Sequence, residues 1–298
     1  MGVRPVAIDS ARGLVARLET PAWVGVGVAL AVWLLVAAFS EPWGRLWGTA
    51  QDARCYWQAT LADPYLHSEW NDPIAYVYSP AFLQLVTPLS ALPWQAFVAV
   101  WAAIAIAVTR WLTGPRLLAA GLLFPFTAME IAGGNIHLLL AGAIVAGFRW
   151  PGTWALVLLT KITPGIGLLW FAVRREWRAL FIAGGVTAVI VAASFIVLPG
   201  AWRQWLDVIL ANAGRGGTWA SVPVPLWIRL PLAVALVVWG ARTDRRWTVP
   251  VASMLALPAL WYGGLSMLLA VIPLLQRDVR QTGSVPNRET RADVAANA

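Results

Sequence analysis

The chain has 298 residues, of which 59% are apolar or aromatic and only 12% are charged. A soluble domain carries about 45–50% apolar and about 25% charged residues, so this composition excludes a disordered chain and argues against a soluble enzyme. The net charge of +8 does not indicate nucleic-acid binding, because the arginines gather at the ends of apolar runs, as they do in membrane proteins. We therefore expect the lipid bilayer as partner and no nucleic acid.

The first apolar run, 22–39, lacks a cleavage site before the next polar stretch, which predicts an uncleaved membrane span. The longest polar stretch, 40–77, follows, and we expect a short surface helix within it, at 50–62. The remaining apolar runs are 78–92, 93–112, 117–130, 135–149, 151–173, 178–198, 225–241, 247–260 and 261–275.

This pattern predicts an all-α fold, a polytopic transmembrane helix bundle. At about 20 residues for each span, the length allows about eight to ten spans in one integral membrane domain, 1–275. The polar tail, 276–298, is expected to be disordered. The run 78–92 is short for a span, and it either crosses the membrane or re-enters it.

The distribution of arginine gives the expected orientation, because loops on the cytoplasmic side are enriched in basic residues. With ten spans in the plasma membrane, both termini are cytoplasmic, and the loops 40–77 and 199–224 are extracytoplasmic. In this arrangement the turn at Gly134 faces the cytoplasm, away from Asp52. A re-entrant 78–92 would invert several of the later spans and place Arg174–Arg178 outside.

Asp52 is the candidate catalytic residue, because a carboxylate at the mouth of a bundle can act as a general base toward a substrate hydroxyl. The alternative is a solvated loop aspartate or a helix cap. Arg54 near it could contact a phosphate. Three tyrosines nearby could line a substrate site or belong to an interfacial aromatic belt; they are Tyr56, Tyr76 and Tyr78.

Lys161, the only lysine, lies in the middle of the expected span 151–173. A charge inside the membrane costs about 2.5–3.5 kcal/mol, so Lys161 should face a partner. Glu130 is the structural candidate and a bound phosphate the functional one. His137 could bind a substrate hydroxyl or phosphate, or it could bond a neighbouring helix.

Cys55 is the only cysteine, and His67 and His137 are the only histidines. One cysteine excludes an intrachain disulfide and a paired-cysteine metal site, and two histidines are too few for a histidine-based zinc site. No glycine pair has the pattern of a nucleotide-binding loop. We predict no metal and no cofactor.

Several short motifs, in this order, resemble those of glycosyltransferase family 87 over about residues 40–178. They are Asp52…Tyr56…Asp63-Pro64-Tyr65, Tyr76-Val77-Tyr78-Ser79-Pro80, Pro88-Leu89-Ser90-Ala91-Leu92-Pro93, Gly134-Asn135, and Lys161…Pro164 followed by Arg174-Arg175. The family consists of polytopic membrane enzymes of the GT-C fold. It includes polyprenyl-phosphate-mannose-dependent mannosyltransferases and related arabinofuranosyltransferases.

The resemblance implies a hexosyltransferase of the GT-C type. Its donor would be a polyprenyl-phosphate sugar, with mannose as the first expectation, and its acceptor a hydroxyl of an envelope glycolipid or glycan on the outer face. Asp52 would match the catalytic base of the first loop in an inverting displacement. Stabilisation of the leaving phosphate would come from basic residues; the candidates are Arg54, Lys161, Arg203 and Arg215.

Two other functions stay open at this point. One is a transporter of a lipid or small solute that uses Lys161 and Glu130 as an intramembrane charge pair. The other is a non-catalytic membrane partner of an envelope-synthesis complex.

Overall fold

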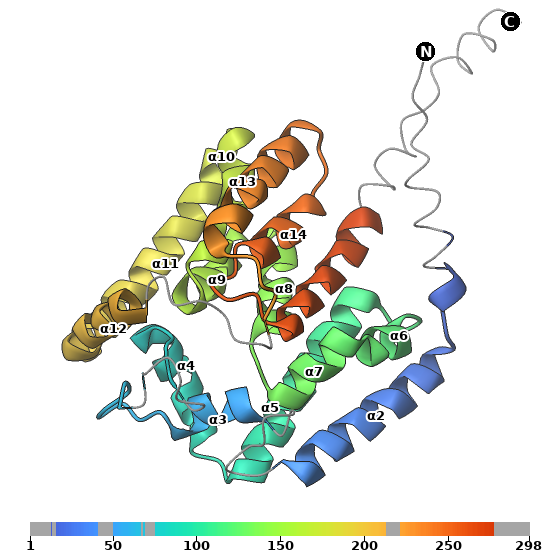
Figure 1. Cartoon of the computed structure of the whole chain (residues 1–298), viewed down its shortest axis with the longest axis horizontal. Coiled ribbons are helices and arrows are strands. Elements are labelled where there is room, and N and C mark those ends of the chain that lie inside the picture. The colour runs from blue at the N-terminus through green and yellow to red at the C-terminus, as the bar shows by residue number, and fades with distance from the viewer. Residues whose placement is uncertain are drawn as a thin grey trace, which may run out of the picture.

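The structure is a computed structural model that describes residues 13, 16–40, 50–66, 68, 75–212 and 221–276. Within these ranges the regular elements are helices, and the one exception is an isolated antiparallel bridge between Ser221 and Trp261. The expected all-α fold is confirmed (Figure 1). The tail from 277 onward lies outside the described residues.

The α-helices are α2 (Ala22–Phe39), α3 (Gln51–Gln58), α4 (Pro80–Ser90), α5 (Trp94–Thr113), α6 (Leu118–Leu123), α7 (Pro125–Gly133), α8 (His137–Gly147), α9 (Trp154–Thr160), α10 (Leu169–Val173), α11 (Trp177–Val197), α12 (Pro199–Asn212), α13 (Leu226–Arg242) and α14 (Thr248–Leu255). Three segments are 3-10 helices: η1 (Pro151–Thr153), η2 (Thr163–Leu168) and η3 (Tyr262–Ala270).

Fewer helices than expected have the length of a span. In the described part of the chain, α2, α5 and α11 are long and apolar enough to cross a membrane. The pair α7 and α8 adds a fourth candidate if it counts as one span, although the two helices meet at 111°. The other runs form shorter or interrupted helices, so the count of eight to ten full-length spans is not reproduced.

Proline, glycine and lysine account for the interruptions. Pro125 starts α7 directly after α6, and it cannot donate a backbone hydrogen bond to the preceding turn. Gly134 ends α7 in the left-handed conformation, with φ of 70°. Lys161 ends α9 in an extended conformation. The expected span 151–173 is therefore broken at Lys161, and the lysine does not lie in mid-helix as predicted.

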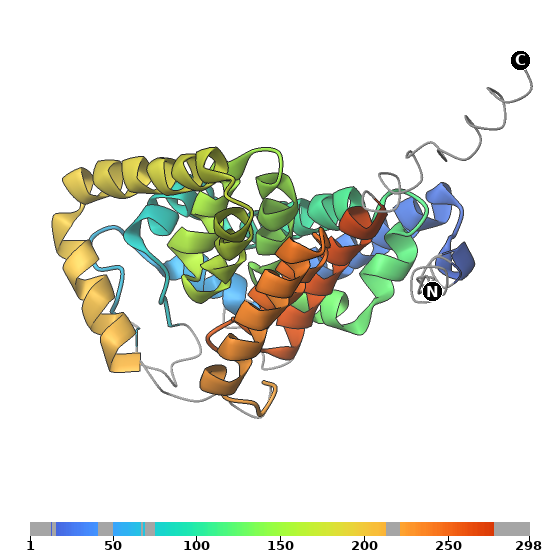
Figure 2. The ribbon, with the colours of Figure 1, turned by 90° about the horizontal axis from the view of Figure 1, so that it is seen from above.

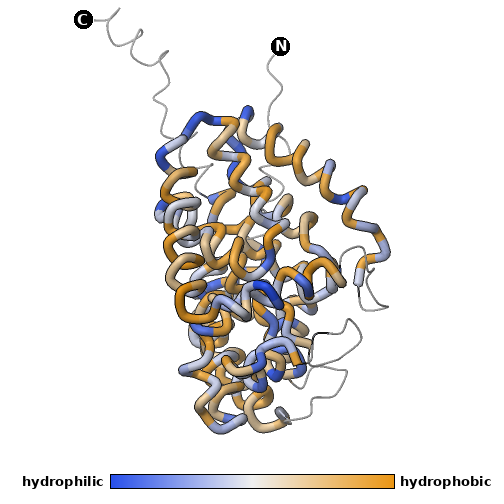
Figure 3. The backbone as a smooth tube through the Cα atoms, turned by 90° about the vertical axis from the view of Figure 1, so that its left-hand side faces the viewer, coloured by the Kyte–Doolittle hydropathy of each residue, from blue (hydrophilic) through white to orange (hydrophobic). Residues whose placement is uncertain are grey.

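The flanking helices α2 and α11 present apolar side chains outward. Phe39, Phe181 and Ile196 are between 70% and 80% exposed, and the backbone is coloured as hydrophobic along much of the helical bundle (Figure 3). Water would penalise such a surface, whereas lipid tails accept it. These two helices are the natural lipid-facing flanks of the bundle.

The bundle has two ends, which we call the α3 end and the opposite end. The chain leaves the α3 end on α5, because Trp57 donates its indole N–H to Leu92 O at 2.9 Å, just before α5 begins. It returns on α6 and α7, where Ala50 donates its backbone N–H to Ala132 O at 2.8 Å. The start of α2 lies at the opposite end, where Thr20 bonds Arg116 O.

The segment 137–161 forms a hairpin that starts and ends at the α3 end. Its first arm, α8, has 11 residues and is about 16 Å long, roughly half the hydrocarbon thickness of a bilayer. The chain then turns through η1 and comes back on α9 to Lys161, whose Nζ lies 2.8 Å from Nε2 of His137.

The helices of the C-terminal half also run between the α3 end and the opposite end. Arg174 pairs with Asp244 at 2.9 Å and donates to Ala241 O at 3.2 Å, which joins the loop before α11 to the end of α13 at the opposite end. Buried Arg229, near the start of α13, donates to the carbonyl oxygens of Val224, Leu255, Leu257 and Pro258. This clamp fixes the chain that leads into η3.

The expected loop 199–224 contains a helix. It begins with the 14-residue α12, which meets α11 at a corner (Figure 2). Trp205 on α12 donates to Val77 O at 3.2 Å, and Asn212 donates to Ser68 O at 3.2 Å. This helix therefore packs against the first long loop instead of forming a free loop of its own.

Candidate active site

Asp52 lies in the first turn of α3, as the sequence indicates. Ala50, directly before the helix, adopts the left-handed conformation with φ of 59°, and its hydrogen bond to Ala132 anchors the helix start to the end of α7. Tyr56 follows Asp52 by one helical turn, so the two side chains share one face of α3.

The glycine turn after α7 forms one wall of the site around Asp52. A Cβ on Gly134 would lie 2.5 Å from Cβ of Ala53, and one on Gly133 would lie 3.3 Å from Oδ2 of Asp52. The Asn135 side chain donates a hydrogen bond to the Asp52 carboxylate and accepts one from the backbone N–H of Ile136 at 2.7 Å. The prediction that this turn faces away from Asp52 is wrong.

The error comes from the run 78–92. It forms α4, a helix of only 11 residues with Pro88 inside it, about 16 Å long and too short to cross the membrane. Between residues 52 and 134, in the part that the structure describes, α5 leads from the α3 end to the opposite end, and α6 with α7 leads back. Residues 52 and 134 therefore lie at the same end. The short α4 agrees with the re-entrant alternative, but Arg174 and the loop before α11 lie at the opposite end and not on the side of Asp52, as that alternative required.

Two buried side chains, Glu130 and His137, and the half-buried Lys161 are connected beside Asp52. His137 donates its backbone N–H to Oε1 of Glu130 at 2.5 Å, and its Nδ1 lies 3.0 Å from Oε2 of Glu130. On the other side of the ring, Nε2 lies 2.8 Å from Nζ of Lys161. Glu130 is thus not the direct ion-pair partner of Lys161 that the sequence suggested, because His137 lies between them.

Lys161 reaches this position because it ends α9 at the helix break. Its Nζ lies over the ring of Tyr78, 6.0 Å from the centroid, at the outer limit of a cation–π contact. Tyr78 O–H and Tyr56 O–H lie 3.2 Å apart. Asp52, Tyr56, Tyr78, His137 and Lys161 therefore belong to one group at the α3 end.

The electrostatics of this group favour a base that works near neutral pH. Burial raises the pKa of the Asp52 carboxyl to about 6, and the Glu130 carboxylate acts in the same direction, while Lys161 and the Asn135 hydrogen bond oppose the change. A carboxylate with a raised pKa is a better proton acceptor than a solvated aspartate. Asp52 is half-buried as a whole residue, so part of its surface stays accessible to a substrate.

Of the other predicted site residues that the structure describes, Arg54 and Arg203 lie apart from this group and Tyr76 packs against it. Arg54 is buried and donates to Oε1 of Gln58 at 3.0 Å, and at two positions from Asp52 it occupies another face of α3. Tyr76 supports the site from behind, with its hydroxyl donating to Ser79 O and its ring 5.7 Å from that of Tyr78. Arg203 is exposed on α12, and Arg215 lies outside the described residues.

Two residues were left out of the predicted site although they contact it. Glu130 bonds His137, and Asn135 bonds Asp52. A buried glutamate in an apolar helix and an amide after two glycines are the signals that point to them. The sequence analysis places Glu130 only beside Lys161 and Asn135 only in the Gly134-Asn135 motif, because the turn between them is expected on the cytoplasmic side.

The part of the chain that the structure describes holds no group of three histidine, cysteine, aspartate or glutamate residues arranged to bind a metal.

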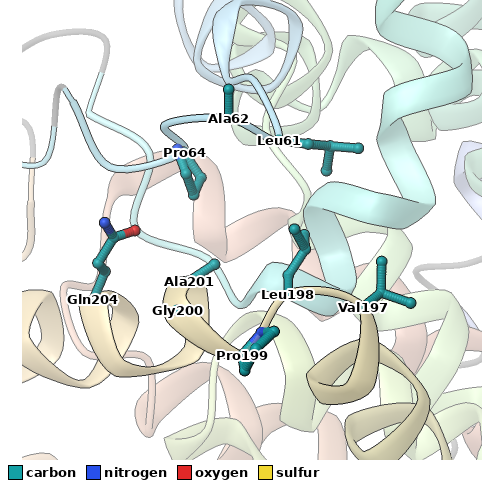
Figure 4. Close-up of a pocket in the computed structure, with 9 residues that line it drawn as sticks. All are labelled: Leu61, Ala62, Pro64, Val197, Leu198, Pro199, Gly200, Ala201 and Gln204. Atoms are coloured by element: carbon teal, nitrogen blue, oxygen red, sulfur yellow. The ribbon is translucent and has the colours of Figure 1, made fainter.

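A cavity of about 240 Å³ lies between the 61–64 loop and the corner of α11 and α12 (Figure 4). Leu61, Pro64, Val197 and Leu198 are among its mostly apolar lining residues. The charged group around Asp52 does not line it.

The described part of the chain is thus a helical bundle with helices that could cross a membrane, and a carboxylate, a histidine and a lysine meet at one end of it. The profile of glycosyltransferase family 87 matches residues 76–283. This chain belongs to glycosyltransferase family 87 and is a membrane glycosyltransferase. No curated protein and no solved structure matches the chain.

The family match covers a different stretch from the expected 40–178. It extends through α14 and η3, and it starts at Tyr76, after α3. Asp52 therefore lies outside the matched range. Its link to the matched part is the set of contacts with Gly133, Gly134 and Asn135.

Proposed function

We propose that this chain transfers a hexose, with mannose as the first expectation, from a polyprenyl-phosphate donor to a hydroxyl of an envelope glycolipid or glycan. Asp52 is the general base and Lys161 contacts the donor phosphate. The observation that supports this proposal best is the meeting of Asp52 with the chain's only lysine at one end of a membrane bundle.

The charges suit an inverting displacement. Asp52 takes the proton of the acceptor hydroxyl, the new bond forms between that oxygen and the anomeric carbon, and the bond from the anomeric carbon to the phosphate oxygen breaks. The phosphodiester donor carries one negative charge and the departing polyprenyl phosphate carries two. Lys161 neutralises the charge that develops, where low dielectric makes such a contact strong.

The same geometry supports a position for the donor phosphate next to Lys161. His137 accepts one N–H of the Lys161 ammonium, which leaves two donors for phosphate oxygens. Tyr56 and Tyr78 form an aromatic wall beside Lys161. Arg203 and Arg215 are the proposed further contacts of the donor or acceptor head group from the side of α12.

The arginines support an active site on the outer face of the plasma membrane. In the described ranges they are unequally divided between the two ends, and loops rich in arginine stay in the cytoplasm. At the opposite end lie Arg17, Arg110, Arg116, Arg149, Arg174, Arg175, Arg178, Arg242, Arg245 and Arg246, and at the α3 end Arg54, Arg203 and Arg229.

This division supports a topology with the α3 end outside and both termini in the cytoplasm. In this proposal 1–275 is one GT-C-type membrane domain and 276–298 is its cytoplasmic tail. The number of arginines differs more between the two ends than it would between the two sides of a ten-span topology. The reason is that the short α4 does not cross the membrane and so does not reverse the direction of the chain. The lipid-linked donor then enters from the outer leaflet.

Detergent-purified protein is incubated with radiolabelled polyprenyl-phosphate mannose and a total lipid extract of the host. Label that moves into a new glycolipid supports the proposal and identifies the acceptor fraction. Donor that binds without transfer points to a missing acceptor, and a series of purified glycolipids then follows. Protein that neither binds nor transfers mannose from this donor contradicts the mannosyl assignment, and other polyprenyl-phosphate sugars are tested next.

A further inference from the structure

Glu130 is a buried carboxylate that neither the expected mechanism nor the family match assigns to a role. It is 2% exposed and His137 is fully buried. An ionised carboxylate in such surroundings is costly unless hydrogen bonds and an opposite charge compensate it. Glu130 has both: two N–H groups of His137, and the ammonium of Lys161 beyond the ring.

The contacts define how the protons are arranged. Glu130 accepts the backbone N–H of His137 through Oε1, so Oε2 is left to accept the proton on Nδ1. A neutral imidazole with its proton on Nδ1 has a lone pair on Nε2. That lone pair faces Nζ of Lys161, so a lysine ammonium at this position donates a hydrogen bond to it.

Backbone packing holds the arrangement in place. A Cβ on Gly263 would lie 2.7 Å from Oε2 of Glu130, and one on Gly264 would lie 3.8 Å from Cε1 of His137. The start of η3 therefore closes over both side chains. Because Nδ1 faces Glu130 and Nε2 faces Lys161, the tautomer of the ring decides whether Lys161 finds an acceptor or a donor.

We propose that Glu130 is a positioning residue: it fixes the Nδ1-protonated tautomer of His137, whose Nε2 then holds the Lys161 ammonium, charged and directed to the donor phosphate beside Asp52. The role of the phosphate rests on the proposed function. The tautomer does not, and it can be measured without any substrate.

The first test observes the tautomer directly. Replacing His67 by Gln leaves His137 as the only histidine, and ¹⁵N-histidine labelling of that protein in micelles reports both ring nitrogens. We expect a protonated Nδ1 and an unprotonated, hydrogen-bonded Nε2. In Glu130→Gln the proton should move to Nε2 in a large part of the molecules. A wild-type ring with its proton on Nε2 would overturn the proposal.

The second test measures transfer. Glu130→Gln should lower kcat/KM about 10–100-fold, the usual effect of removing a group that orients an active-site partner, and Glu130→Asp should recover part of the loss. Glu176→Gln is the matched control, because Glu176 pairs with Arg174 at the opposite end. It should leave the rate unchanged.

A double-mutant cycle separates positioning from a general effect on folding. If Glu130 acts through Lys161, adding Glu130→Gln to Lys161→Met should cause no further loss of transfer, whereas independent effects multiply. Multiplying effects, or equal loss in Glu176→Gln, contradict the positioning role. If the wild type neither binds the donor nor transfers sugar from it, the mannosyl assignment fails, and the ¹⁵N measurement still decides the tautomer.

Discussion

Gly134 packs against Ala53, the residue that follows Asp52, so closely that a methyl group on Gly134 would lie 2.5 Å from Cβ of Ala53. This contact joins two segments about eighty residues apart in sequence and brings the end of α7 to the proposed base. It also connects α3, which lies outside the family match, with the part of the chain that the match covers.

We expect Gly134→Ala to lower stability by about 1–3 kcal/mol, because alanine is strained at φ of 70° and its methyl group displaces α3. Since α3 carries Asp52, sugar transfer should fall more than stability does. Thermal unfolding in detergent and the transfer rate are measured together.

The control for this variant is Gly184→Ala on α11, where nothing lies within 4 Å of the added methyl group. A helical glycine replaced by alanine gains about 0.5–1 kcal/mol in an ordinary helix. Equal stability of the Gly134 and Gly184 variants would contradict the packing of α7 against α3.

Transfer should depend on pH through Asp52. With a pKa of about 6, the base is protonated below that value, so kcat/KM should rise with pH through about 6 and then level off. A solvated aspartate would stay active down to about pH 4. A profile without an inflection between pH 5 and 7 would rule out Asp52 as a base with a raised pKa.

Asp52→Asn should not destabilise the protein at pH 8. The pKa of Asp52 is raised in the folded state, so the carboxyl group favours folding below its unfolded pKa near 4 and loses this contribution as pH rises through about 6. Asparagine does not titrate, so the variant loses no stability in this way as pH rises. Its melting temperature should equal or exceed that of the wild type at pH 8, and the difference should shrink toward pH 5.

Membrane orientation can be tested by cysteine labelling in intact cells after Cys55 is replaced by Ala. Leu66 is 70% exposed near the α3 end, and Arg178 is exposed at the opposite end. An impermeant maleimide should label Leu66→Cys and leave Arg178→Cys unlabelled until the membrane is opened. The reverse pattern would place the site in the cytoplasm.

The helical class followed from composition, because only a bilayer accepts so many apolar residues. The helix breaks did not follow, since an apolar run looks alike whether the chain crosses the membrane or turns back at Gly134 and Lys161. Hydropathy measures the affinity of a segment for lipid. It does not report whether hydrogen bonds such as that from Lys161 to His137 hold a half-length hairpin.

The sequence predicts the residues of the candidate site better than it predicts their arrangement. Asp52, Tyr56, Tyr78, His137 and Lys161 were all singled out, and the structure brings them together. The connection of Lys161 to Glu130 through His137 depends on the 111° turn between α7 and α8. Tertiary packing sets that angle, and no local pattern encodes it.

The most direct test of the central claim is the rate of sugar transfer by Asp52→Asn beside Asp63→Asn, with polyprenyl-phosphate mannose as donor. Asp63 is an exposed aspartate of the same loop, so it controls for the loss of a charge there. The account predicts that Asp52→Asn loses about 10²–10⁴-fold in kcat, the typical contribution of a general base, while Asp63→Asn keeps the wild-type rate. Transfer by Asp52→Asn at the wild-type rate would contradict the account.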